Sequence, residues 1–175
     1  MNIELADYGL VIEFGTREDF DTKLKMNGET FEDVINYTDA QGRSLLSRCL
    51  ISRKFDLAKE FLEHNAEVNR VGKDGCNEFH YIAANIRYGG VEVARMLLER
   101  GVSLMAKDKS YGNTALSTLY LEILKTRSDE EMAFLEDCFR QAESFDVCNK
   151  YGNSARKLVN KYGPEKLKEI VEERQ

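Results

Sequence analysis

The sequence has a single proline among its 175 residues and no stretch rich in serine and glycine. Long linkers and disordered segments usually carry such stretches, so we expect an ordered chain throughout. No apolar run approaches the ~18 residues that a membrane-spanning helix needs. The N-terminal stretch carries Glu4, Asp7 and Glu13 where an export signal would carry basic residues. We therefore expect neither export nor membrane binding.

The cysteines and the motifs for catalysis are equally sparse. Four cysteines, Cys49, Cys76, Cys138 and Cys148, form no Cys-x-x-Cys pair. Zinc knuckles need such pairs, and no disulfide framework is indicated, so the expected location is a reducing cytoplasm. A glycine-rich phosphate loop and a Gly-x-Ser-x-Gly motif are both missing, and the acidic pairs have no neighbouring nucleophile. We predict no enzymatic activity, no metal and no cofactor.

Basic residues are not in excess, because the formal net charge is −6. Nucleic-acid binding relies on clustered lysine and arginine, so we expect no nucleic-acid partner. Residues 1–40 hold ten acidic and three basic side chains, whereas residues 149–175 hold four acidic and seven basic ones. The acidic segment either forms solvated helix faces or attracts a basic protein partner by complementary charge.

What the sequence does contain is an internal repeat. Four glycines, Gly42, Gly75, Gly112 and Gly152, lie 33, 37 and 40 residues apart. Two positions after each glycine stands a short polar residue that can cap a helix, and a short helix is predicted to follow. These cap residues are Ser44, Asn77, Thr114 and Ser154.

A second helix is predicted after each of the first two short helices. The stretch "FDLAKEFLEHNAEV" at residues 55–68 matches "VEVARMLLERGVSL" at residues 91–104. In both, apolar residues at positions i, i+1, i+4 and i+5 share one helix face. Asn65 and Gly101 then fall where a left-handed residue ends a helix. A pair this short cannot bury its apolar face alone, so we expect the pairs to stack.

The period, the "D/N-x-x-G" turns, His80 in "NEFHYIAA" and "G-x-V-E-V-A-x-x-L-L-x-x-G" resemble the ankyrin repeat. This resemblance implies an all-α fold, an ankyrin-type solenoid of stacked helix-turn-helix repeats with short hairpin loops and capping repeats at both ends. We expect one monomeric domain over residues 1–175, and "FGTREDFDTKLKM" resembles the start of its N-terminal cap. The boundaries expected are a cap at 1–36, repeats at 37–69, 70–105 and 106–146, and a closing repeat at 147–175.

The sequence also departs from the family pattern in several places. Proline is usual after the short polar position and is replaced at all four sites. Arg53 stands where a glycine usually joins the two helices, and "NIRYGG" lengthens the same connector in the next repeat. Extra residues around "EILKTRSDEE" enlarge the third repeat, where Ser128 and Glu131 predict a capping box.

His80 and Cys76 are four residues apart and could supply half of a metal site. The resemblance favours a structural role, because a histidine in this position of the family bonds to the backbone of the neighbouring turn. We therefore predict no metal site.

The resemblance implies that a protein partner binds the concave face made by the hairpin tips and the exposed ends of the first helices. Tyr88, Tyr111 and Tyr151 stand out, because tyrosine and arginine are enriched where binding energy concentrates. The predicted partner-binding residues are Gln41, Arg43, Lys73, Asp74, Asn85, Arg87, Tyr88, Ser110, Tyr111, Asn113, Lys150 and Tyr151.

Two functions remain open from the sequence. The first is a non-catalytic protein-protein interaction module. The alternative is an immunity-type inhibitor that neutralises a cognate bacterial toxin or enzyme, suggested by the small size, the acidic charge and the divergent repeats.

Overall fold

The computed structural model describes residues 2–174. Within them the chain forms eleven α-helices and one short 3-10 helix, and β-pairing is limited to two isolated bridges. The all-α prediction is therefore confirmed. None of the described helices is both long and apolar enough to cross a membrane. The helices are α1 (Tyr8–Phe14), α2 (Arg17–Asn27), α3 (Phe31–Val34), α4 (Leu45–Ile51), α5 (Phe55–Glu63), α6 (Glu78–Ala83), η1 (Ile86–Tyr88), α7 (Val91–Glu99), α8 (Ala115–Ile123), α9 (Asp129–Gln141), α10 (Ala155–Tyr162) and α11 (Glu165–Glu173).

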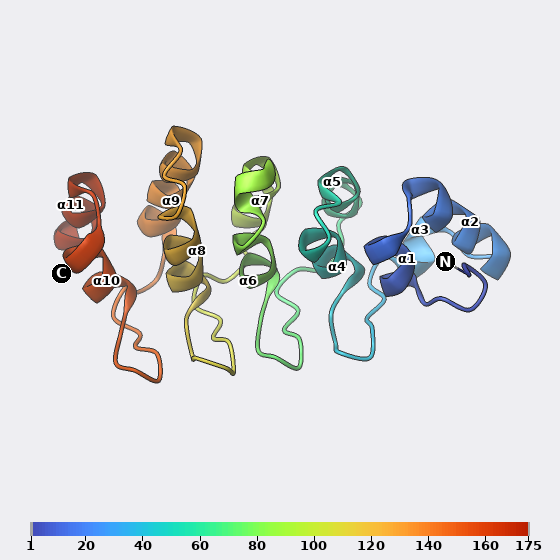
Figure 1. Cartoon of the computed structure of the whole chain (residues 1–175), viewed down its shortest axis with the longest axis horizontal. Helices are drawn as coiled ribbons and strands as arrows, with labels where there is room; N and C mark the ends of the chain where they lie inside the picture. Colours follow the sequence, from blue (N-terminus) through green and yellow to red (C-terminus); the bar gives the residue numbers. More distant parts are fainter. Residues whose placement is uncertain (1, 175) are drawn as a thin grey trace.

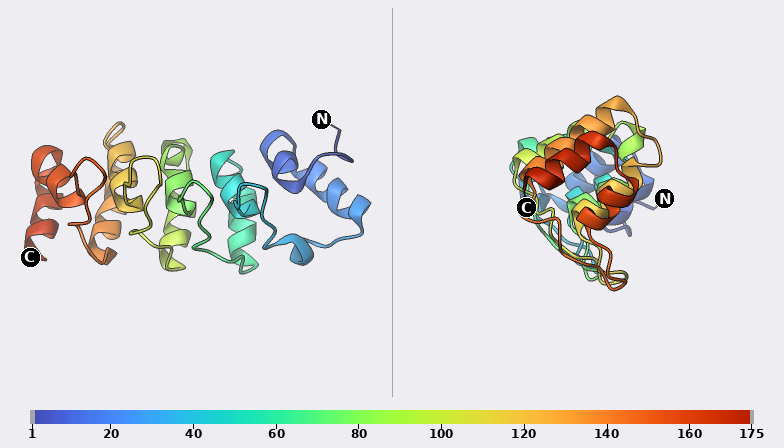
Figure 2. Two further views of the ribbon diagram at one scale, coloured as in Figure 1. Left: turned by 90° about the horizontal axis from the view of Figure 1, so that it is seen from below. Right: turned by 90° about the vertical axis from the view of Figure 1, so that its left-hand side faces the viewer.

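The helices form antiparallel pairs that stand side by side in a row, with the two termini at opposite ends (Figure 1). α4 pairs with α5, α6 with α7, α8 with α9, and α10 with α11, and each pair packs against the next. The hairpin loops between pairs all project to one side, and they overlap when the row is viewed along its length (Figure 2). The row thus has a helical body and a comb of exposed hairpins.

The second helices pack as their periodicity predicts. In α5 the buried residues are Leu57, Ala58, Phe61 and Leu62, and α7 buries the equivalent set. Burial of one such large side chain contributes roughly 1.5–3 kcal/mol. Asn65 has a φ of 62° after α5, so the left-handed residue expected there is observed.

Short polar residues begin the first helices. Ser44 and Thr114 accept hydrogen bonds from the backbone N–H three residues later, at 3.1 and 3.2 Å, and Ser154 makes the same contact. Asn77 begins α6 as predicted, and its side chain also makes a contact outside the helix. Its Nδ2 donates to the carbonyl of Ser103 at 2.7 Å, which ties α6 to the loop after α7.

Helix α1 lies before the stretch that resembles the start of the N-terminal cap. Asp7 accepts a hydrogen bond from the Leu10 amide at 2.8 Å and starts α1. The stretch that resembles the start of the cap instead holds the turn between α1 and α2, where Thr16 and Asp19 form a reciprocal capping box. Helix α1 was missed because it has only seven residues and includes Gly9, a poor helix former.

The extra residues of the third repeat lengthen its helices, since α9 has thirteen residues whereas α7 has nine. Ser128 accepts from the Glu131 amide at 3.3 Å and begins α9, as predicted. The reciprocal half of the predicted capping box is not made. The buried Glu131 carboxylate accepts a hydrogen bond from the Thr126 hydroxyl instead.

Candidate functional site

Single backbone hydrogen bonds join each hairpin to the next. These bonds fix the position of each hairpin relative to the next, although the bonded residues are 32 to 39 positions apart in the sequence. The amides of Lys73, Lys109 and Lys150 donate to the carbonyls of Gln41, Asp74 and Tyr111, at 2.9, 2.8 and 2.9 Å respectively.

We call the solvent-facing side of the four hairpins the tip surface; it consists of residues 40–43, 72–76, 108–113 and 149–153. Two predicted residues dominate it. Tyr111 is 55% exposed and Tyr151 is 70% exposed, and their ring centroids lie 6.4 Å apart on adjacent hairpins. Large exposed aromatics of this kind are typical of contact residues. The other predicted residues that are exposed here are Gln41, Lys73, Ser110 and Lys150.

Three predicted residues of the tip surface are partly buried and bonded within the protein. Arg43 donates to Asp74 across two hairpins at 2.9 Å, and Asp74 also accepts from the Tyr81 hydroxyl at 2.8 Å. Burial opposes ionisation of Asp74, but the Arg43 and Cys76 contacts outweigh it and lower the pKa of this carboxyl. Asn113 accepts from the Asn149 side chain at 2.8 Å. These residues hold the hairpins together.

A shallow cleft of about 340 Å³ lies between the third hairpin and helices α6 and α8, which are the first helices of their pairs and are called inner helices here. Tyr111 and Ser110 form one wall, and Leu121 on α8, 38% exposed, lies on another. The cleft also reaches His80 on α6. It therefore provides an apolar recess beside the exposed tyrosines. The remaining lining residues are Cys76, Asp108, Asn113, Thr118 and Glu122.

His80 has the structural role expected from the resemblance. Its Nε2 lies 3.3 Å from the carbonyl oxygen of Asn113 in the next hairpin, and its Nδ1 lies 3.2 Å from the Asn77 amide, which donates to it. Nδ1 also lies 2.8 Å from the Asn77 side-chain oxygen Oδ1, so both ring nitrogens are engaged within the protein. Burial lowers the pKa of His80, although the Asn113 contact opposes this shift.

Cys76 stays a thiol at neutral pH, because burial raises its pKa to about 12. A thiol makes a poor metal ligand, since metals bind the thiolate. Among residues 2–174 no three metal-ligating side chains are grouped together.

The remaining predicted residues, Asn85, Arg87 and Tyr88, lie at the far end of α6 from the hairpins. Asn85 is only 9% exposed, and its Nδ2 donates to the carbonyls of Leu50 and Ile51 at the end of α4, at 3.1 and 2.9 Å. It therefore completes the neighbouring helix, and we leave it out of the proposed contact surface.

Tyr88 is 47% exposed and belongs to a separate cluster with two arginines. The Arg53 guanidinium lies 3.7 Å from its ring centroid, and that of Arg87 lies 4.9 Å away. Arg53 has a φ of 59°, and its Nε donates to the side-chain oxygen Oδ1 of Asn85 at 2.9 Å. The two departures from the repeat pattern, Arg53 and the lengthened connector, thus stabilise one another.

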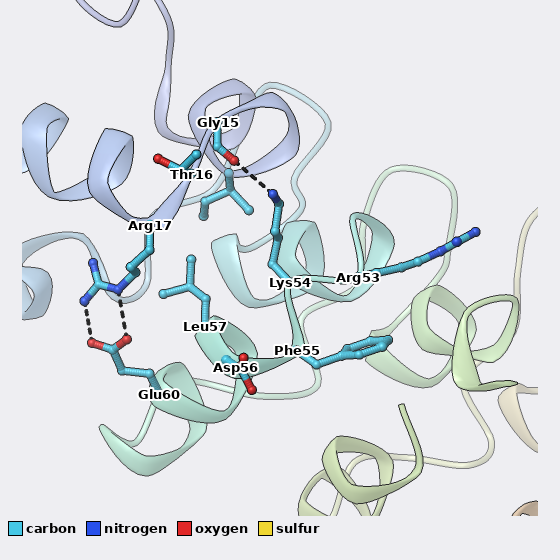
Figure 3. Close-up of a pocket in the computed structure, with 10 residues that line it drawn as sticks. Gly15, Thr16, Arg17, Arg53, Lys54, Phe55, Asp56, Leu57 and Glu60 are labelled. Atoms are coloured by element: carbon cyan, nitrogen blue, oxygen red, sulfur yellow. Dashed lines mark hydrogen bonds and ion pairs between the residues drawn. The ribbon is translucent and has the colours of Figure 1, made fainter. Parts of the chain in front are cut away.

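A second cavity, of about 370 Å³, lies where the turn between α1 and α2 meets the connector between α4 and α5 (Figure 3). Arg17 and Glu60 face one another across it in a two-bond ion pair, at 2.7 and 3.2 Å. Lys54 donates to the carbonyl of Gly15 at 2.9 Å, at the end of α1. These polar groups therefore bind one another and join α1 and α2 to the α4–α5 pair.

Sequence reasoning missed several residues of the tip surface and the cleft. Leu121 was overlooked because it lies in "ALSTLYLEILK", where apolar residues occupy all sides of the helix and suggest burial. Lys109 was overlooked because the third hairpin has one more residue than the others, which obscures its equivalence to Lys73 and Lys150. Only the backbone bonds between hairpins reveal that equivalence.

Stacked helix pairs joined by hairpins in register define a helical repeat protein. Residues 74–109 match the family model of the ankyrin repeat. The chain therefore contains an ankyrin repeat, as its residue pattern predicts. The match runs from the second hairpin tip through α6 and α7 to the third tip. No curated protein matches the chain.

Proposed function

We propose that the chain is a non-catalytic module that holds a protein partner against its concave face. Ankyrin repeats are protein-protein interaction modules, and we infer that the row of helix pairs is one ankyrin-type solenoid closed by a cap at each end. The proposed contact surface is the tip surface with the adjoining cleft. Arg87 and Tyr88 extend it at the far edge of the inner helices.

The observation that carries the proposal is the pair of exposed rings at the tips. Tyr111 lines a cleft that contains Leu121, and the Tyr151 ring lies next to that of Tyr111, so aromatic, hydroxyl and apolar groups are close together. Binding energy in protein interfaces concentrates on such aromatic residues next to recesses. The rigid hairpins present them with little entropy to lose on binding.

The inhibitor alternative depends partly on the acidic N-terminal segment. Several of its acidic side chains make hydrogen bonds within the protein. Asp7, Asp19 and Asp33 cap helices, and Glu29 accepts from the Tyr8 hydroxyl. Carboxylates engaged in this way contribute less to attracting a basic partner, so the general binding function is better supported than a charge-driven inhibitor.

The test is affinity capture with a tagged chain from the cell that expresses it. Substitution of both tip tyrosines, Tyr111→Ser and Tyr151→Ser, should abolish capture of the proteins that the unmodified chain retains. The melting temperature should stay within about 2 °C, because both side chains are exposed. Met26→Ser, an exposed position on α2, is the matched control and should capture normally. Equal capture by the double variant would show that the contact surface lies elsewhere.

A further inference from the structure

The register of the hairpins places three lysines at equivalent positions. Each of Lys73, Lys109 and Lys150 donates its backbone amide to the preceding hairpin. The three side chains therefore leave the chain at the same point of successive hairpins and form a row across the tip surface. Neighbouring packed helices lie roughly 8–10 Å apart, so we expect a similar spacing between the lysine backbones of adjacent hairpins.

These lysines have no carboxylate partner among residues 2–174. Lys73 and Lys109 are exposed, and the Lys150 ammonium donates only to carbonyl oxygens of the third hairpin. The positive charge of the row is therefore not neutralised within the protein.

The acidic groups of the same hairpins are already engaged. Asp74 accepts from the Arg43 guanidinium, and Asp108 accepts from the backbone amides of Tyr111 and Asn113. At the margin of the cleft, Glu122 pairs with Lys125. The solvent-facing charge of the tip surface is thus positive, although the whole chain carries a net charge of −6.

We propose that the tip surface binds an extended acidic segment of the partner protein, with a carboxylate at every third residue opposite Lys73, Lys109 and Lys150. The spacing supports this periodicity, because an extended chain rises ~3.3 Å per residue and three residues span about 10 Å. Apolar residues between the carboxylates would pack on Tyr111 and Tyr151. The proposal rests on the function proposed above and specifies the chemistry of the partner.

The probe is a fluorescein-labelled peptide that repeats Glu-Leu-Ser, measured by fluorescence anisotropy with the full chain. It should bind, and a peptide of the same composition with its glutamates contiguous should bind more weakly. Lys73→Gln with Lys109→Gln should weaken binding about tenfold, as expected for two exposed charge contacts. Lys25→Gln with Lys168→Gln removes the same charge from α2 and α11 and should leave binding unchanged.

The proposal is overturned if the regular peptide does not bind, or if the contiguous peptide binds equally well. It is also overturned if both lysine pairs have the same effect, or if a single-stranded oligonucleotide of equal charge binds as tightly, since the surface would then attract any polyanion. Partner capture separates this failure from failure of the proposed function. If the tyrosine variant loses its partner while the Lys73 and Lys109 variant retains it, the contact surface stands and the acidic segment is refuted.

Discussion

The substitution Gly75→Ala tests the contact between hairpins at its tightest point. Gly75 has a φ of +82°, and a Cβ built there would lie 2.7 Å from the carbonyl oxygen of Lys107 and 2.9 Å from the amide of Lys109. Both atoms belong to the backbone of the next hairpin, so the clash cannot be relieved by rotation of a side chain. Hairpins 2 and 3 must therefore move apart.

Gly152→Ala is the matched control, because Gly152 has a similar φ of +74° with no atom within 4 Å of the added Cβ. The left-handed conformation alone costs an alanine roughly 1–2 kcal/mol. Gly75→Ala adds about 1–3 kcal/mol for overpacking and ~1 kcal/mol for the weakened Lys109–Asp74 hydrogen bond. We therefore expect Gly75→Ala to destabilise the chain by about 2–4 kcal/mol more than Gly152→Ala does.

The assay is thermal unfolding followed by circular dichroism. At ~2–4 °C per kcal/mol for a chain of this length, Gly152→Ala should lower the melting temperature by a few degrees. Gly75→Ala should lower it by roughly 5–15 °C more, on the same scale. Equal shifts for the two variants would refute the close contact between the second and third hairpins.

Further predictions concern the connector, the first hairpin and the cysteines. Asn85→Ala should lower the free energy of unfolding in urea by about 2–3 kcal/mol, because it leaves the buried carbonyls of Leu50 and Ile51 with one partner fewer. Arg53→Gly should change the free energy of unfolding by less than about 1 kcal/mol, since relief of the left-handed conformation offsets the lost contacts. Similar losses for both variants would contradict the roles assigned to these residues. Burial opposes ionisation of Asp39, but the Arg43 and Gln41 amides and Arg48 outweigh it and lower its pKa. Its contribution to stability is therefore present above the ordinary aspartate value of ~4 and is lost as the pH falls below it, so Asp39→Asn should reduce the change in urea midpoint between neutral and acidic pH; an unchanged pH profile would contradict this. Iodoacetamide should modify the exposed Cys148 before Cys76, whose pKa is raised to about 12 by burial, and mass spectrometry of the peptides would show a reversed order if this assignment were wrong.

Much of the fold follows from local patterns in the sequence. The apolar residues of α5 and α7 recur with a helical period, and Ser44 and Thr114 begin helices as short polar residues do. The turn glycines take positive φ values because the hairpin turns require them, so the positions of the turns could be predicted from the sequence. Helix α1 was not predicted, since it is short and contains a glycine, and neither was the four-residue helix α3.

The candidate site was harder to predict, because it depends on contacts between distant residues. Asn85 was expected on the surface by its place at the end of a first helix, yet its amide meets carbonyls 34 and 35 residues earlier. The row formed by Lys73, Lys109 and Lys150 exists only because each hairpin bonds to its predecessor. Residue spacing varies between repeats, so no fixed period in the sequence reveals that row.

The register between hairpins is most directly tested by amide hydrogen exchange, measured residue by residue by NMR. The amides of Lys73, Lys109 and Lys150 lie at exposed tips and should nevertheless exchange at least about tenfold more slowly than unstructured amides, because each donates to the neighbouring hairpin. Exchange of all three at the rate of an unstructured peptide would mean that the tips move independently, and a fixed row of lysines would then not exist.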